Sequence, residues 1–224
     1  MNTNNSTKIK RLVGISTLCA ITFVLQFVVS GVLPKLPLGG GTAVNLALIP
    51  VVLGAILYGP LGGLSVGLFL GATTLLPGQG AEGFYVNWYM VLLAIFLCLA
   101  KAGLAGLVSG LAFKVLRKKN YVVAIFVAAA CAPIVNTGIF LLLYGLLIFI
   151  MTGEAYSTTF VAVATAVWLV FLVELTVNLV VSPALASLIK VLVRNHDLGF
   201  VNDVTEVAGD KIDDSVFDEL AQEK

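Results

Sequence analysis

The chain has 224 residues and a formal net charge of +1, with 59% hydrophobic and 11% charged residues. Its mean hydropathy of +1.05 excludes a soluble domain. Continuous apolar runs of about 18 or more residues recur, which is typical of transmembrane helices and unlike the alternating pattern of membrane strands. The sequence therefore predicts an all-α membrane protein.

Six apolar segments follow one another along the chain, at 11–33, 43–59, 61–76, 88–116, 121–151 and 160–193. The first resembles a signal peptide because basic residues precede it. However, its apolar run is long enough to span a bilayer, and no small-residue cleavage site closes it. We therefore expect it to be retained as the first transmembrane helix.

The second and third segments form one nearly continuous apolar run, 46–76, which either a single kinked helix or a hairpin would explain. The basic residues at 8–11 place the N-terminus in the cytoplasm by the positive-inside rule. A hairpin that turns at Gly59-Pro60 brings the basic cluster 117–119 to the same side, whereas a single helix puts it outside. Pro60 also disfavours a helical conformation at Gly59. We predict six transmembrane helices, a short second and third helix, and cytoplasmic termini.

The charge distribution divides the chain into two parts. Residues 1–194 form the predicted six-helix domain, with eleven basic residues and three acidic ones. Residues 195–224 carry nine acidic residues and two lysines. We expect this acidic cytoplasmic tail to be disordered.

Lys101 and Glu174 are the formal charges near the centres of predicted spans. A charge at the bilayer centre costs at least about 2.5–3.5 kcal/mol, so both side chains should face the interior of the bundle. Two interpretations stay open. The two residues form a structural ion pair, or Lys101 meets an anionic group of a substrate and Glu174 sets its environment.

Two further polar features are candidates for ligand contacts. Asn136 follows Pro133 in the fifth segment, where it either bonds a neighbouring helix or contacts a solute. The stretch "EGFYVNWYM" places Tyr85, Asn87 and Trp88 at a membrane boundary. These residues form either an interfacial aromatic belt or the wall of a binding site.

The sequence contains no sign of an enzyme. The single histidine, His196, lies in the acidic tail, so neither a histidine-based catalytic site nor a metal site is expected. No G-x-x-x-x-G-K-[ST] motif occurs, so the chain has no recognisable means of hydrolysing ATP. We expect no cofactor and no nucleic-acid partner.

Two segments carry a family resemblance. "NLALIPVVLGAILYGPLGGLSVGLFLG" (45–71) and "CAPIVNTGIFLL" (131–142) resemble the S-components of energy-coupling factor (ECF) vitamin transporters, and the resemblance covers about 10–194. It implies a multi-pass protein of a prokaryotic plasma membrane that binds a vitamin near the extracellular side. A separate transmembrane coupling protein and two cytoplasmic ABC ATPases would supply the energy.

The resemblance also implies roles for single residues. The first helix of the family docks on the coupling protein through a small-xxx-small motif, commonly Ala-xxx-Ala. The best match here is Ser16-xxx-Ala20, which departs from alanine at the first position. Serine is still small enough for two helices to approach closely.

Among S-components, the chain most resembles those assigned to pantothenate. Lys101, Asn136 and the stretch containing Tyr85, Asn87 and Trp88 would then contact the vitamin. Riboflavin, cobalamin, folate and biotin remain alternatives. Two other classes of protein compete with the S-component. One is a self-sufficient, ion-coupled secondary transporter of a small organic anion, and the other is an accessory protein without a ligand.

Overall fold

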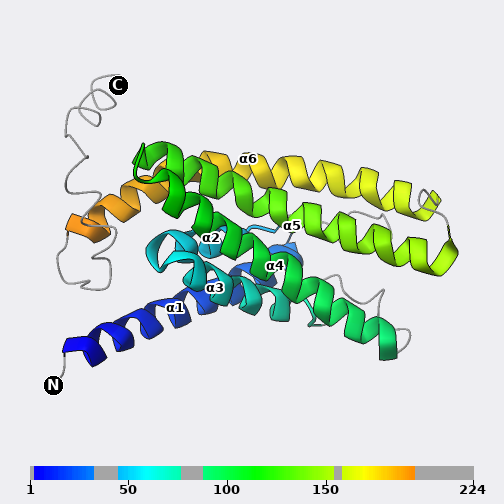
Figure 1. The fold of residues 1–224 in the computed structure, drawn as a ribbon, viewed down its shortest axis with the longest axis horizontal. Helices are drawn as coiled ribbons and strands as arrows, with labels where there is room; N and C mark the ends of the chain where they lie inside the picture. The colour runs from blue at the N-terminus through cyan, green and yellow to red at the C-terminus, as the bar shows by residue number, and fades with distance from the viewer. Residues whose placement is uncertain (1–2, 33–44, 77–87, 154–157, 195–224) are drawn as a thin grey trace.

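A computed structural model of the chain describes residues 3–32, 45–76, 88–153 and 158–194. These residues form helices only (Figure 1), which are α1 (Thr3–Val32), α2 (Leu48–Leu57), α3 (Gly59–Thr73), α4 (Trp88–Leu116), α5 (Tyr121–Thr152) and α6 (Thr158–Arg194). The first and last three are long and apolar enough to cross a membrane, whereas α2 and α3 are shorter apolar helices. The predicted all-α fold with six helices is confirmed. The acidic tail lies outside the described residues.

The short helices form the predicted hairpin. α2 ends at Leu57 and α3 begins at Gly59, whose φ of 76° lies in the left-handed region that glycine adopts at little cost. Pro60 occupies the first turn of α3, where its missing N–H breaks no helical hydrogen bond. At 1.5 Å per residue, the 10 residues of α2 and the 15 of α3 cover less than a hydrocarbon core of about 30 Å.

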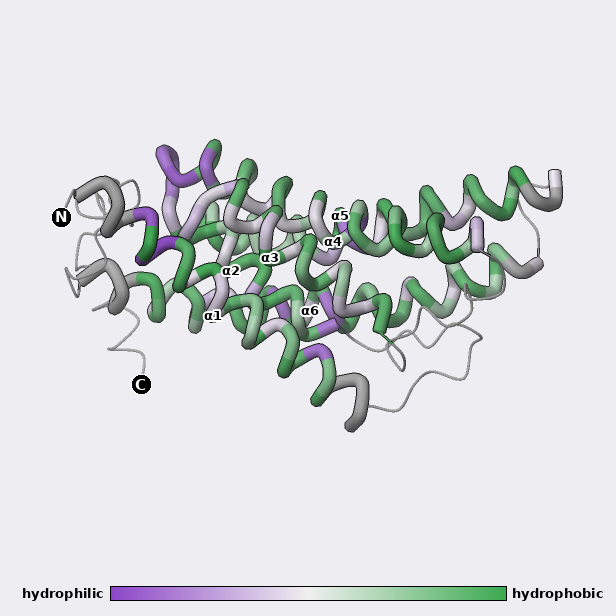
Figure 2. Tube along the Cα trace, turned by 90° about the horizontal axis from the view of Figure 1, so that it is seen from below, coloured by the Kyte–Doolittle hydropathy of each residue, from purple (hydrophilic) through white to green (hydrophobic). Residues whose placement is uncertain are grey.

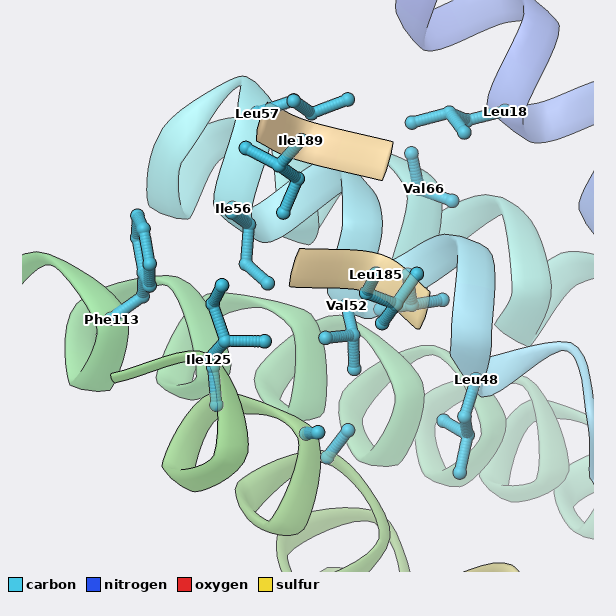
Figure 3. Close-up of a cluster of buried hydrophobic side chains, with 14 of the residues drawn as sticks. Leu18, Leu48, Val52, Ile56, Leu57, Val66, Phe113, Ile125, Leu185 and Ile189 are labelled. Carbon is cyan, nitrogen blue, oxygen red and sulfur yellow. The ribbon is translucent and has the colours of Figure 1, made fainter. Parts of the chain in front are cut away.

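The helix α2 lies at the centre of the bundle and contacts all five other helices. Its side chains Leu48, Val52 and Ile56 are fully buried. Figure 3 shows them converging with Leu18 of α1, Val66 of α3, Phe113 of α4, Ile125 of α5 and Leu185 of α6. Inside a membrane such a core is held by close packing rather than by exclusion of water. The position of α2 therefore depends on contacts from every side.

The helices α3 and α4 pack at very short range. Three glycines of α3 lie against the backbone of α4, and a Cβ added at any of them would collide with a main-chain carbonyl group. The pairs are Gly63 with Gly106, Gly67 with Ala102, and Gly71 with Cys98. This contact fixes the backbone of α4 on both sides of Lys101.

The start of α1, the turn at Gly59, the turn at 117–120 and the end of α6 all lie at one end of the bundle (Figure 1). Hydrophilic residues gather at this end, whereas the rest of the bundle is mostly hydrophobic (Figure 2). The arrangement agrees with the predicted topology, in which both termini lie on the same side. That this side is the cytoplasm stays a prediction.

Candidate functional site

Lys101 lies near the middle of α4 and is partly buried in the bundle. Its Nζ atom is 5.2 Å from the centre of the Phe140 ring on α5. A cation at this distance from an aromatic face is attracted by about 0.5–2 kcal/mol, depending on how fully it is desolvated. The ring thus holds the ammonium group between α4 and α5 without neutralising its charge.

Asn136 lies one helical turn before Phe140, so both side chains lie on the same side of α5. Asn136 is 6% exposed, and its buried Oδ1 atom accepts no hydrogen bond. Leaving a buried acceptor unsatisfied costs about 1–3 kcal/mol. A group that donates to this oxygen would remove the cost. Thr137 beside it is also buried.

Glu174 lies in the middle of α6 and is 4% exposed. Its Oε1 atom accepts a hydrogen bond of 2.8 Å from the backbone N–H of Asn45, just before α2. Asn178 lies one turn further along α6, and its Nδ2 atom donates to the backbone oxygen of Glu174 at 2.8 Å. As predicted from its sequence position, Glu174 faces the interior.

In the part of the chain that the structure describes, no salt bridge joins Lys101 to Glu174. Glu174 Oε1 accepts the backbone N–H of Asn45, and Lys101 Nζ lies over the Phe140 ring. The ion pair between Lys101 and Glu174 therefore stays a prediction.

One of the predicted aromatic residues, Trp88, lies at the start of α4. Trp88 is the first residue of the helix and is 76% exposed. Its ring meets that of Tyr89 edge-on, with 6.2 Å between the ring centres. Tyr85 and Asn87 lie outside the described residues. Trp88 thus lies at the bundle end opposite the start of α1 and the end of α6, well along α4 from Lys101 (Figure 1).

Ser16 and Ala20 lie on the exposed side of α1. The buried side of the helix carries Leu18, Thr22 and Gln26, which recur every four residues. α1 packs mainly against α2 and α3, so its outer side is open along much of its length. The two small residues are therefore accessible to another helix in the membrane.

The family described as "ECF transporter, substrate-specific component" matches residues 10–193, which is most of the chain. The chain belongs to this family. It is an S-component. No curated protein and no solved structure matches the chain significantly.

The assignment settles several of the predictions. An S-component is a transport subunit without catalytic activity, and it resides as a multi-pass protein in a prokaryotic cell membrane. It binds a substrate and works with an energy-coupling module. The prediction that the chain is not an enzyme is confirmed. The alternatives of a self-sufficient secondary transporter and of an accessory protein without a ligand lose their support.

Sequence reasoning missed two residues of this S-component that contact Lys101 or Glu174, namely Phe140 and Asn45. Phe140 could have been found, because it follows Asn136 by four residues and so lies on the same side of α5. Asn45 could not, because it contributes a backbone N–H that every residue except proline carries.

Proposed function

We propose that this S-component captures pantothenate from the outer side of the membrane. The observation that carries the proposal is the buried, unsatisfied acceptor of Asn136, one turn from the aromatic ring that holds the Lys101 ammonium group. Together these residues offer a cation, a hydrogen-bond acceptor and an apolar wall. A small solute that matches them has an anionic group, an O–H or N–H donor and an apolar portion.

Pantothenate meets each of these requirements. Its carboxylate binds the Lys101 ammonium group by a charge-assisted hydrogen bond, which is strong where water is excluded. One of its hydroxyl or amide groups donates to Asn136 Oδ1 and removes the cost of the unsatisfied acceptor. Its methyl groups pack on Phe140. A few placed polar groups within an apolar lining are the usual composition of a small-molecule site.

The residues near the start of α4 complete the proposed site. Tyr85, Asn87 and Trp88 form its outer wall, at the bundle end where the solute enters. The support for this role is the exposure of Trp88 at the first residue of α4. An exposed indole at that place is available both to the membrane interface and to an arriving solute.

We further propose that the energy-coupling module consists of a transmembrane coupling protein and two cytoplasmic ABC ATPases. Ser16 and Ala20 form the surface on which the coupling protein docks. Their exposure on α1 supports this role, because small side chains let a partner helix approach closely.

The solute that the purified protein retains tests this proposal. The protein is purified without added vitamin and denatured, and the released small molecules are identified by mass spectrometry. Binding of radiolabelled pantothenate is then measured in competition with riboflavin, folate, biotin and cobalamin. We expect pantothenate to be recovered and to bind saturably. Recovery of one of the other vitamins, which also displaces pantothenate, would contradict the assignment.

A further inference from the structure

The carboxylate of Glu174 connects two parts of the chain that are far apart in sequence. Its Oε1 atom accepts the backbone N–H of Asn45 at 2.8 Å, across a separation of 129 residues. The side chain of Asn45 acts locally, since its Oδ1 atom accepts the N–H of Ala47 at 3.2 Å. Glu174 on α6 is thus bonded to the residue from which the chain enters α2.

This contact is favourable for a buried carboxylate. The Asn45 N–H is a backbone donor just before α2, whose N-cap is Ala47, and a buried carboxylate needs such donors. A hydrogen bond from a backbone N–H to a charged acceptor is also stronger than one between neutral groups. The bond from Asn45 therefore partly offsets the cost of burying the Glu174 carboxylate, and no salt bridge to Lys101 is seen among the described side chains.

The start of α2 matters for Lys101 and Asn136 because of where α2 lies. The helix has only 10 residues, and it contacts α4, α5 and α6 as well as α1 and α3. A shift of its first turn would move fully buried side chains such as Leu48, against which the other helices pack. Lys101 and Asn136 lie on two of those helices.

We infer that Glu174 is a positioning residue, which fixes the start of α2 against α6 by accepting the Asn45 N–H and leaves the charge of Lys101 available to the anionic group of the solute. The first part stands on the hydrogen bond alone. The second part deepens the proposed function and rests on it.

Hydrogen–deuterium exchange of the segment around Asn45, in detergent micelles without solute, tests the first part. Glu174→Gln keeps an oxygen acceptor and removes the charge, whereas Glu174→Met removes both. We expect Glu174→Met to speed exchange at Asn45 about tenfold or more, and Glu174→Gln to speed it only a few-fold, because the neutral acceptor forms a weaker bond. Thr176→Val is the matched control, because the exposed Thr176 hydroxyl donates only to Leu172 within α6.

Two outcomes would overturn the inference. If neither substitution speeds exchange, Glu174 does not hold Asn45. If both speed it equally, the oxygen acceptor that Gln retains makes no difference, and the hydrogen bond is not what holds Asn45. Should Glu174→Met fail to fold, Asn45→Pro removes the donor from the other side. Asn45→Ala keeps that donor and loses only the local bond from the Ala47 N–H, so the proline variant should open the segment more than the alanine variant does.

Binding of radiolabelled pantothenate tests the second part. Glu174→Gln should bind within about threefold of the wild type, because no salt bridge among the described side chains ties Lys101 to Glu174. A loss of tenfold or more in a Glu174→Gln protein whose exchange at Asn45 rises only a few-fold would contradict this. If the wild type itself fails to bind pantothenate, the proposed function fails, and the exchange result still decides the role of Glu174.

Discussion

Replacing Lys101 by methionine tests the proposed site most sharply, because the substitution keeps an apolar stem of similar length and removes the ammonium group. In the wild type Nζ lies 5.2 Å from the Phe140 ring, so the methionine side chain can still pack against this ring. What is lost is the charge-assisted hydrogen bond to the solute. Such bonds contribute about 1.5–3 kcal/mol, so the affinity for pantothenate should fall about tenfold to more than a hundredfold.

The assay is equilibrium binding of radiolabelled pantothenate to the purified variant, with thermal unfolding measured in parallel. Lys114→Met is the matched control, because Lys114 is an exposed lysine in the last turn of the same helix. It should bind as the wild type does. A folded Lys101→Met protein whose affinity stays within about twofold of the wild type would refute the contact between Lys101 and the solute.

A double substitution separates the two interpretations of Lys101 and Glu174. If the pair were a structural ion pair, Lys101→Met would leave a buried acid without its partner, and adding Glu174→Gln would restore both stability and binding. If Lys101 binds the solute, the double variant should be as weak in binding as Lys101→Met alone. Near-normal affinity in the double variant would move the site elsewhere, to Asn136 and the Tyr85–Tyr89 stretch.

Four further predictions concern the rest of the molecule. Asn136→Leu should unfold at the same or a higher temperature, since it removes an unsatisfied acceptor, but should bind pantothenate about two- to tenfold more weakly; equal loss of both would indicate a packing role. Gly67→Val should destabilise the protein by several kcal/mol because its side chain meets the Ala102 carbonyl group, whereas Gly138→Ala, which has open space, should not; equal unfolding temperatures would contradict the close α3–α4 contact. Ser16→Trp or Ala20→Trp should reduce co-purification with the coupling protein and spare solute binding, and unchanged assembly of both variants would place docking on another surface. Cysteine labelling should find Gln79 and Thr158 outside and Asn120 inside, and labelling of Asn120 from outside would overturn the predicted topology.

Hydropathy predicted which parts of the chain are helical and the first residues of α4 and α5, but not where α1, α2, α3 and α6 begin. α1 begins at Thr3, eight residues before the apolar run at 11–33. A hydropathy pattern marks only the apolar part of a helix, whereas the helix itself continues through the polar residues before it. The hairpin was predictable from Gly59 and Pro60, since both residues act through local backbone geometry.

The candidate site was predictable only in part, for a physical reason. Charged and polar residues are rare within membrane-spanning segments, so Lys101, Asn136 and Glu174 could be singled out as interior residues. Their partners could not be derived in the same way. The bond from Asn45 to Glu174 uses a main-chain donor, and the contact of Lys101 with Phe140 uses an aromatic residue in a chain that has many.

Uptake of radiolabelled pantothenate into vesicles most directly tests the claim that this S-component captures the vitamin and depends on partners for energy. The chain is reconstituted alone and together with the coupling protein and the two ATPases, each with and without ATP inside the compartment that the ATPases face. We predict binding but no uptake by the chain alone, and ATP-dependent uptake by the full assembly. Accumulation of pantothenate by the chain alone under an ion gradient, or no uptake by the full assembly with ATP, would contradict this account.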